Sequence, residues 1–285
     1  MSPSSYLICS TVRSGSTLLS RTLGQLEGCG QPEEYFHRHT IRDKKLNQRS
    51  EAFRAYCHDI RHNSFETFGT FGIKMHWWQL SDFLAMARHA LDSQSAKQSD
   101  RAVLEQFFPG LKYVYLRRED VVAQAVSAAI ASQTGQWEKH SPTHSEENGA
   151  ADSRPIGAIK FHPWKIYEWE TLLEQQNQSW KTFFQDGKIL PYSLTYESLV
   201  NNFLQEISHV LQHIGLASKM NSNSLSMPVQ RQANAANARL ISAYNRLPTP
   251  VSASLLRLYR WRWPLNDTVL PLPGQKGAEK KGGLA

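Results

Sequence analysis

A short basic and hydroxyl-rich segment near the N-terminus has the residue types that bind an oxyanion. Residues 6–9 are apolar and predict a strand, while the leucines of residues 18–26 fall on one face of a predicted helix. A turn between a strand and a helix presents unpaired backbone N–H groups and the positive end of the helix dipole. Serine and threonine also begin ordinary helices, but an arginine inside the turn favours a phosphate or sulfate site. The residues of this segment are Arg13, Ser14, Gly15, Ser16 and Thr17.

The segment differs from the phosphate loop of nucleotide kinases. That loop has the pattern G-x-x-x-x-G-K-[ST], whereas here Gly15 stands alone and the basic residue precedes it. A second apolar strand, predicted over residues 112–116, runs into Arg117 and Arg118 and not into an obvious magnesium-binding carboxylate. We therefore expect a ligand with anionic groups at two separate places, whose charge is neutralised by arginine and not by a metal ion.

Strands and helices alternate along the chain, which predicts a mainly parallel sheet with helices on both faces and ligand sites at the strand C-terminal ends. Strands are expected over residues 6–9, 71–75, 112–116 and 189–195. Helices are expected over 17–25, 83–86, 102–107, 121–132 with Asp120 as cap, 161–184 and 197–214, with a helical insertion over 37–66. We expect one α/β domain over 1–271, a mobile lid or surface loop over 135–155, a linker over 220–228 and a disordered tail over 272–285.

The composition indicates a globular protein with anionic binding partners. The chain has 285 residues, of which 40% are hydrophobic and 20% charged, and it contains neither a run of 18 apolar residues nor a secretory signal pattern. Its three cysteines are odd in number and far apart, which predicts reduced thiols and a cytoplasmic location. The net charge of +7 favours anionic partners, but the basic residues are scattered, so we do not expect nucleic acid binding.

Two further clusters have ordinary structural explanations. The basic and aromatic residues of 257–263 could stack nucleic acid bases, but a C-terminal helix with its aromatic side chains packed inward explains them better. His58 and His62 lie one helical turn apart, but the residues between them do not form a metalloprotease signature. We therefore expect a helix surface there and no metal site.

Several segments resemble sulfotransferases that use 3′-phosphoadenosine 5′-phosphosulfate (PAPS), and in detail the bacterial trehalose 2-sulfotransferase family. Residues 13–19 are similar to the family's 5′-phosphosulfate loop, and residues 118–127 are similar to its 3′-phosphate segment. Together the matches follow the expected order over residues 5–240. The other matching segments are Pro32-x-Glu34-Tyr35-Phe36, Gly72-Ile73-Lys74-Met75, Gln133-Thr134 with Trp137, Tyr196-Glu197 and Arg231-Gln232-Ala233.

The resemblance implies both a fold and a reaction. The fold is the sulfotransferase fold, a P-loop-like, mainly parallel sheet between two layers of helices. The reaction is the in-line transfer of a sulfuryl group from PAPS to a hydroxyl of a sugar or glycolipid, with a trehalose-like acceptor suggested by kinship alone. The family often dimerises, so a homodimer is also expected. Two alternatives use the same scaffold: a P-loop phosphoryl-transfer enzyme, and a non-catalytic protein that binds a nucleotide or a carbohydrate.

The resemblance also assigns the residues that contact PAPS. The backbone N–H groups of residues 14–17 hold the 5′-phosphate, and Arg13 stabilises charge on the bridging oxygen as the sulfuryl group departs. Arginine stands where lysine is conventional; it can hold two oxygens at once but is a poor proton donor, so we expect electrostatic stabilisation there and not acid catalysis. The residues assigned to the 3′-phosphate and the adenosine are Arg118 or Arg117, Ser127 with Gln124 one turn before it, Arg231, and Tyr196 near the adenine.

Glu34 is the general base that the resemblance implies for the acceptor hydroxyl. Without the resemblance, Glu33 and Glu34 could equally form a solvated turn after Pro32, and His37 is the more natural proton acceptor. A carboxylate of ordinary pKa is a weak base, so this role requires burial or hydrogen bonds that tune it.

Other side chains are candidates for contact with the acceptor. Lys74, at the end of the second predicted strand, could reach the sulfuryl group or a sugar hydroxyl. The flat rings of Trp77 and Trp137, and of Trp78, could stack on a sugar, but tryptophan also fills protein cores.

Overall fold

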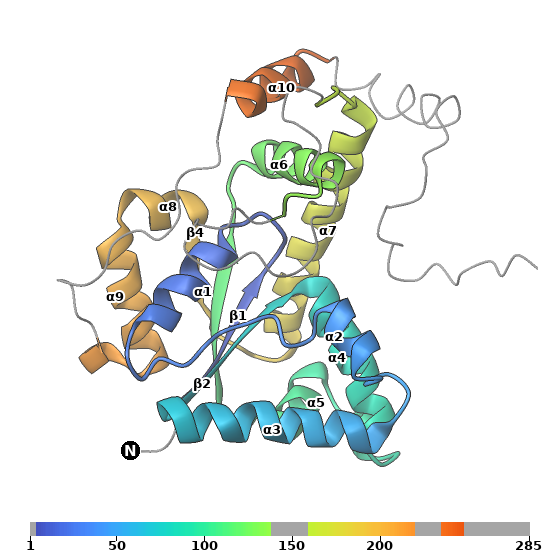
Figure 1. Ribbon diagram of the computed structural model, residues 1–285, viewed down its shortest axis with the longest axis vertical. Helices are drawn as coiled ribbons and strands as arrows, with labels where there is room; N and C mark the ends of the chain where they lie inside the picture. The colour runs from blue at the N-terminus through green and yellow to red at the C-terminus, as the bar shows by residue number, and fades with distance from the viewer. Residues whose placement is uncertain (1–3, 138–158, 220–234, 248–285) are drawn as a thin grey trace, which may run out of the picture.

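The computed structural model describes residues 4–137, 159–219 and 235–247, and in this part of the chain four parallel strands form one sheet (Figure 1). The chain passes from β1 to β2 on one side and then to β3 on the other side of β1, so the strand order reverses between β1 and β3. Open parallel sheets bind ligands at such a reversal, beyond the carboxyl ends of the strands. In the order β2-β1-β3-β4, the strands are β1 (Ser4–Ser10), β2 (Thr70–His76), β3 (Leu111–Arg117) and β4 (Tyr192–Thr195).

The alternating side chains of β1 pack into two separate cores, one on each face of the sheet. Tyr6 and Ile8 are fully buried in the core that includes α1 (Ser16–Gln25) and α9 (Phe203–Ile214). Leu7 and Cys9 are fully buried in the opposite core, which is built by α3 (Ser50–Phe68), α4 (Trp77–Ala90), α5 (Asp100–Phe107) and α7 (Pro163–Asp186). Both faces of the sheet are covered, which explains why the sequence of β1 is a nearly continuous apolar run. The predicted α/β fold with helices on both faces is confirmed.

The remaining helices complete these layers. The helical insertion expected over residues 37–66 is present as two helices, of which the longer packs against β2 and α4. On the other side of the molecule α6 packs against α7, and α10 lies over α6 (Figure 1). The elements are α2 (Arg38–Asp43), α3 (Ser50–Phe68), α4 (Trp77–Ala90), α5 (Asp100–Phe107), α6 (Val121–Thr134), α7 (Pro163–Asp186), α8 (Tyr196–Asn201) and α10 (Ala235–Asn245), with short 3-10 turns at Ser95–Lys97 and Ala217–Lys219.

Two expectations near β4 need correction. The strand expected from residue 189 begins only at Tyr192, because Pro191 has no N–H to donate to the sheet ladder. The single helix expected over 197–214 is two helices, α8 and α9, because the backbone at Asn202 (φ −126°, ψ 45°) is not helical. The cap predicted at Asp120 is confirmed, since its carboxylate accepts a hydrogen bond of 2.8 Å from the N–H of Ala123.

Several expectations fall outside the described residues. These are most of the lid over 135–155, the linker over 220–228, Arg231, the basic helix of 257–263 and the tail over 272–285. Within the described ranges, no helix is both long and apolar enough to span a lipid bilayer.

Candidate active site

The predicted oxyanion loop connects β1 to α1 and ends at a glycine that a side chain could not replace. Gly15 has a left-handed backbone (φ 89°) and is the N-cap residue of α1, where it supplies no side chain to the first turn. A Cβ placed on Gly15 would lie 2.5 Å from Cδ2 of Tyr196. The aromatic ring at the start of α8 therefore packs directly on the loop.

The loop leaves polar groups ready for a ligand. The hydroxyl of Ser14 is buried and has no hydrogen-bond partner among the described residues, and Ser16 is buried beside it at the start of α1. An unsatisfied buried hydroxyl costs free energy, and the backbone N–H groups of an uncapped first turn have partial positive charge. An oxyanion at this helix start would satisfy both, so the residues present fit a phosphate or sulfate group.

Arg13 joins the loop to α6. Its backbone is left-handed (φ 60°), and its guanidinium donates to Oγ of Ser127 over 3.0 Å and to the carbonyl of Trp137. Gln124, one turn before Ser127, donates to Oγ1 of Thr11 (2.9 Å) and to the carbonyl of Val12 (2.6 Å). The structure thus brings Arg13 and Ser127 together, while Gln124 holds the loop backbone in place.

A second cationic group lies on the other side of Tyr196. The guanidinium of Arg118 is 5.0 Å from the centre of the Tyr196 ring and 3.7 Å from a carboxylate oxygen of Glu197. Nε of Arg118 is buried without a hydrogen-bond partner in the described residues. Arg117 is more exposed and faces Glu119 at 4.0 Å, so Arg118 is the arginine that reaches the loop region.

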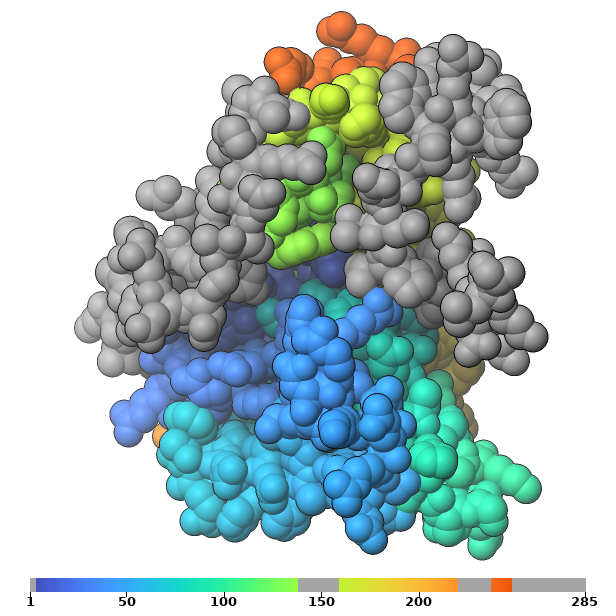
Figure 2. Space-filling view, turned by 45° about the vertical axis from the view of Figure 1, so that its right-hand side comes forward, coloured from blue at the N-terminus to red at the C-terminus, as the bar shows by residue number. Residues whose placement is uncertain are grey.

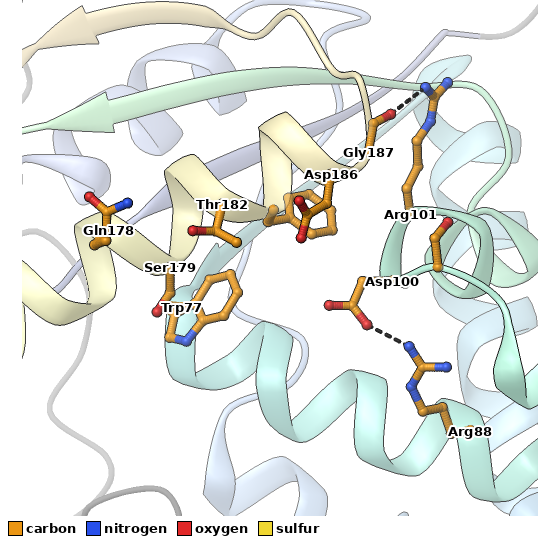
Figure 3. A pocket seen from close by; sticks show the side chains of 11 residues that line it. Trp77, Arg88, Asp100, Arg101, Gln178, Ser179, Thr182, Asp186 and Gly187 are labelled. Atoms are coloured by element: carbon orange, nitrogen blue, oxygen red, sulfur yellow. Dashed lines mark hydrogen bonds and ion pairs between the residues drawn. The ribbon is translucent and has the colours of Figure 1, made fainter.

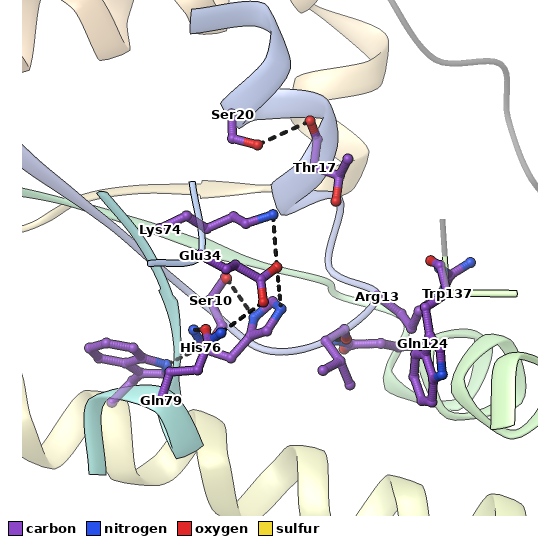
Figure 4. A network of polar contacts seen from close by, with 12 residues as sticks. Ser10, Arg13, Thr17, Ser20, Glu34, Lys74, His76, Gln79, Gln124 and Trp137 are labelled. Carbon is purple, nitrogen blue, oxygen red and sulfur yellow. Dashed lines mark hydrogen bonds and ion pairs between the residues drawn. The ribbon is translucent and has the colours of Figure 1, made fainter. Parts of the chain in front are cut away.

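The carboxylate of Glu34 lies in a network of four polar side chains from β1, β2 and α4 (Figure 4). Its Oε1 is 2.9 Å from Nζ of Lys74 and 3.5 Å from Nε2 of His76, and its Oε2 accepts a hydrogen bond of 2.7 Å from Gln79. Nδ1 of His76 is 3.0 Å from Oγ of Ser10, the last residue of β1. This chain of contacts connects Glu34 to the strand that leads into the oxyanion loop.

The network keeps Glu34 ionised. Burial alone would raise the pKa of this carboxyl, but the charges and hydrogen bonds of His76 and Lys74 hold the pKa well below its usual range. The side chain of Glu34 is 23% exposed, whereas that of Lys74 is 5% exposed. The ionised carboxylate is therefore a hydrogen-bond acceptor that remains partly exposed.

The strand register explains why these residues meet. Ser10 of β1 pairs with His76 of β2 at the carboxyl ends of the two strands. Because side chains alternate between the two faces along a strand, Lys74 and His76 lie on the same face of β2. The carbonyl of Glu33 accepts a hydrogen bond of 3.0 Å from the N–H of Lys74, which places the next residue, Glu34, over β2.

The two other candidate bases lie differently. Glu33 pairs with β2 through its backbone and is absent from the polar contacts described around Glu34. His37 caps α2, where its Nδ1 accepts from the N–H of His39 (3.4 Å), and burial lowers the pKa of its imidazole. Of the three, Glu34 is the residue in the network that reaches β1.

Sequence reasoning identified Glu34 and Lys74 but missed Ser10, His76 and Gln79. A signal for His76 was present, since it follows Lys74 by two residues on the same strand and must share its face. Gln79 could have been noticed as the third residue of a helix that begins directly after the strand.

Of the three tryptophans that could contact sugar, Trp137 and Trp77 lie in different places. Trp137 is 38% exposed, packs edge to face against Trp169 of α7, and adjoins Arg13 through its carbonyl. Trp77 instead faces α7, where its ring meets Trp180 edge to face at 5.2 Å. It lines a cavity of about 450 Å³ between α4, α5 and α7, together with Asp100, Thr182 and others (Figure 3).

The surface view agrees with a site at the strand ends. Figure 2 shows a recess between α6 (green) and α2 (bright blue), with dark blue residues from the start of the chain at its floor. Among the described residues, no group of three or more His, Cys, Asp or Glu side chains could hold a metal ion.

The fold is α/β, and the candidate oxyanion loop lies at the reversal of its strand order. The model of the Stf0 sulphotransferase family matches residues 5–246, and the chain belongs to this family. It is thus a member of the sulfotransferases, and the resemblance found in the sequence is confirmed.

Two relatives are similar to this chain over most of their length. One is the protein named trehalose 2-sulfotransferase of Mycobacterium tuberculosis, 25% identical over 263 residues that cover 84% of this chain and 93% of the relative. The other has the same name in Mycolicibacterium smegmatis and is 23% identical over 270 residues, covering 86% of this chain and 95% of the relative.

Replacing Gly15 by alanine tests the contact between the loop and Tyr196. We expect Gly110→Ala, at φ 71° with nothing within 4 Å of the new methyl, to lose about 1 kcal/mol from backbone strain alone. Gly15→Ala adds a collision with the Tyr196 ring and should lose at least about 1 kcal/mol more. Urea unfolding measures both; equal losses would show that the ring does not constrain the loop.

Replacing Lys74 by methionine tests the electrostatics of Glu34. A folded-state pKa below the unfolded one adds stability that is present above the unfolded pKa of about 4.3 and is lost as the pH falls. In Lys74→Met the burial cost remains while one compensating charge is lost, so the rise in stability from about pH 2 to pH 7, most of which comes from below the unfolded pKa, should shrink. Urea unfolding across this range gives the comparison, with exposed Lys181→Met as control. A rise as large as that of the wild type in Lys74→Met would contradict this assignment.

Proposed function

We propose that this protein transfers a sulfuryl group from PAPS to a hydroxyl group of a sugar, with Glu34 as the general base. One observation carries the proposal: an uncapped helix start with a buried, unpartnered Ser14 hydroxyl is connected through Ser10 and His76 to the ionised carboxylate of Glu34. An oxyanion site and a proton acceptor thus meet at the ends of neighbouring strands. Family membership supports the sulfuryl chemistry.

The donor would be held by the loops at the ends of β1, β3 and β4. PAPS, when bound, supplies an activated sulfuryl group on a phosphate leaving group. In this proposal the N–H groups of residues 14–17 hold the 5′-phosphate, and Ser127 with Arg118 holds the 3′-phosphate. Nε of Arg118 supports that role, because it makes no hydrogen bond among the described residues and its ion pair with Glu197 is as long as 3.7 Å. Tyr196, which packs between Gly15 and Arg118, would contact the adenosine.

Arg13 would stabilise the charge that develops on the bridging oxygen. Its side chain starts inside the loop and ends at Ser127, so Arg13 connects the two ends of the proposed donor site. Guanidinium groups can hold two oxygens at once, which suits a departing phosphosulfate. Arg231 remains a proposed contact to the 3′-phosphate and lies outside the described residues.

A weakly basic carboxylate is adequate for this reaction. Transfer of a phosphoryl group, and by analogy of a sulfuryl group, passes through a loose transition state in which the attacking hydroxyl carries little negative charge. The hydroxyl becomes acidic only as its oxygen bonds to sulfur, so the proton leaves late and even a carboxylate of lowered pKa such as Glu34 can accept it. Before that, the main task of Glu34 is to orient the hydroxyl for in-line attack.

The sugar acceptor is proposed from the names of the relatives and from the exposed ring at the site. Both relatives are named trehalose 2-sulfotransferases. The ring of Trp137 is exposed beside Arg13 and could stack on a sugar face. Lys74 would act through Glu34, since its ammonium group is buried against that carboxylate. Trp77 remains a predicted contact, although its ring faces α7.

The location and assembly of the protein are also proposed. All three cysteines are buried and unpaired, which suits a reducing compartment, and we propose the cytoplasm. A homodimer remains a prediction from the family resemblance.

Replacing Glu34 by glutamine tests the base and the donor together. Glu34→Gln keeps the shape of the site but cannot accept a proton, so turnover should fall by about 10²- to 10⁴-fold while donor binding stays as in the wild type. Transfer of labelled sulfate from PAPS to trehalose and other glycosides measures turnover, and calorimetric titration with adenosine 3′,5′-bisphosphate measures binding. Glu33→Gln is the matched control and should behave as the wild type.

Two outcomes would contradict the proposal. Full turnover in Glu34→Gln would remove Glu34 as the base. Binding of Mg-ATP without binding of adenosine 3′,5′-bisphosphate would favour the phosphoryl-transfer alternative.

Replacing Arg13 tests its charge separately from its shape. We expect Arg13→Ala to lower kcat/KM for the donor by about 10²- to 10³-fold, as loss of one group that stabilises a transition-state charge does. Arg13→Lys keeps the charge but loses the planar fork and should recover part of the loss. The same sulfate-transfer assay measures both, with the exposed Arg49→Ala as control. If Arg13→Ala had wild-type kcat/KM, the guanidinium would have no part in the transfer.

A further inference from the structure

The side-chain amide of Gln79 has two distinct partners. Its Oε1 accepts a hydrogen bond of 2.7 Å from the backbone N–H of His76, and its Nε2 donates one of 2.7 Å to Oε2 of Glu34. Gln79 is the third residue of α4, and His76 is the N-cap, so the first contact is half of a capping box. The second contact leaves the helix and reaches the proposed base.

These contacts fix the orientation of the amide. A backbone N–H can only donate, so the group of Gln79 that faces His76 must be the oxygen, and the NH₂ group must face Glu34. The side chain of Gln79 is fully buried, and a flipped amide would lose both hydrogen bonds. Gln79 therefore presents a fixed donor to one oxygen of the carboxylate.

The donors around Glu34 leave one position open. Each carboxylate oxygen can accept about two hydrogen bonds. Oε1 is occupied by Lys74 at 2.9 Å and His76 at 3.5 Å, and Oε2 is occupied once, by Gln79. Among the described residues, the remaining acceptor position is therefore on Oε2, and the direction of the Gln79 donor determines which side of Oε2 is open.

We propose that Gln79 is a positioning residue that reserves one lone pair of Glu34 Oε2 for the acceptor hydroxyl and so sets its direction of attack. The proposal rests on the proposed function, in which Glu34 is the base. In the step concerned, the hydroxyl oxygen bonds to sulfur, the bond from sulfur to the bridging phosphate oxygen breaks, and the hydroxyl proton passes to Oε2 of Glu34. The leaving phosphate keeps the electron pair of the broken bond.

The two halves of the amide allow this role to be separated from helix capping. Gln79→Glu keeps an oxygen that can accept from the N–H of His76, but it replaces the donor with a second carboxylate beside Oε2. Two carboxylates at such a distance share one proton, which raises the apparent pKa of the pair. The other charged or titratable groups that face Glu34 are Lys74 and His76 of β2 and His37 at the start of α2, and this substitution leaves them in place.

The test is the pH dependence of kcat in Gln79→Glu. The base must be unprotonated, so activity is lost as the pH falls through the pKa of the pair. We expect the acid limb of the kcat profile to move up by about one unit or more, with KM for PAPS unchanged and activity regained at alkaline pH. A ¹³C titration of glutamate carboxyls in the protein without acceptor should show the same raised pKa independently of turnover.

A matched control separates the shift of the pH profile from the effect of losing a helix cap. Ser99 caps α5 by accepting from the N–H of Ala102 at 3.3 Å, away from Glu34. Ser99→Ala should lose stability of the order of a cap and keep the wild-type pH profile. Gln79→Met removes both contacts of the amide and should lower kcat by about 10-fold without changing donor affinity. This variant tests the same role if Gln79→Glu does not fold.

The outcomes distinguish this proposal from the proposed function. If Glu34→Gln is inactive but Gln79→Glu has the wild-type profile, or Gln79→Met has wild-type kcat, Gln79 is only a helix cap and the positioning role is wrong. If Glu34→Gln is fully active, the base assignment fails, and with it the basis for the role of Gln79.

Discussion

The site depends on the register between β1 and β2. Ser10 and His76 pair as the last residues of the two strands, and the same residue pair hydrogen-bonds through its side chains. Ser10 is also held from the other side, because its carbonyl accepts a hydrogen bond of 2.8 Å from the indole of the fully buried Trp180. The oxyanion loop begins at the residue after Ser10. The contacts that hold Ser10 therefore position both the start of this loop and the Glu34 network. A shift of one residue between these strands would turn His76 to the opposite face of the sheet.

The charges around Glu34 balance opposing requirements. A carboxylate buried alone would become protonated and could not accept a hydrogen bond from a hydroxyl, whereas a carboxylate fully matched by cations is a weak base. Lys74 and His76 ensure ionisation, and the partial exposure of Glu34 leaves room for one more partner. In the proposed reaction, a loose transition state would tolerate the weak base, because orientation would contribute more than proton affinity until the bond to sulfur has formed. The network therefore favours a fixed geometry over a tuned pKa.

The sequence predicted the fold and the segments from which the candidate site is built, but not the contacts between them. Apolar runs located the four strands of the described sheet, and segment 13–17 was identifiable as a candidate because its residues are contiguous. Gln79 and Glu34 are 45 residues apart, and Ser10 and His76 are 66 apart, so their contacts follow only from the sheet register. The direction of the Trp77 ring could not be predicted either, because it depends on the position of α7. The break between α8 and α9 at Asn202 could not be predicted because no proline or glycine marks it.

The chain segments after β3 and β4 are connected to the oxyanion loop by the Tyr196 ring, which contacts Gly15 and Arg118. The ring of Tyr196 fills the space that a side chain at position 15 would need, and Arg118 lies over that ring. The carboxylate of Glu197 faces Arg118 and accepts a hydrogen bond of 3.0 Å from the N–H of Glu119, which ties the end of β3 to the start of α8. The loops after β1, β3 and β4 are thus packed against one another through one glycine and one aromatic ring. A ligand that contacts both the oxyanion loop and Arg118 must span the reversal in strand order, where no single segment of the chain could bind it alone.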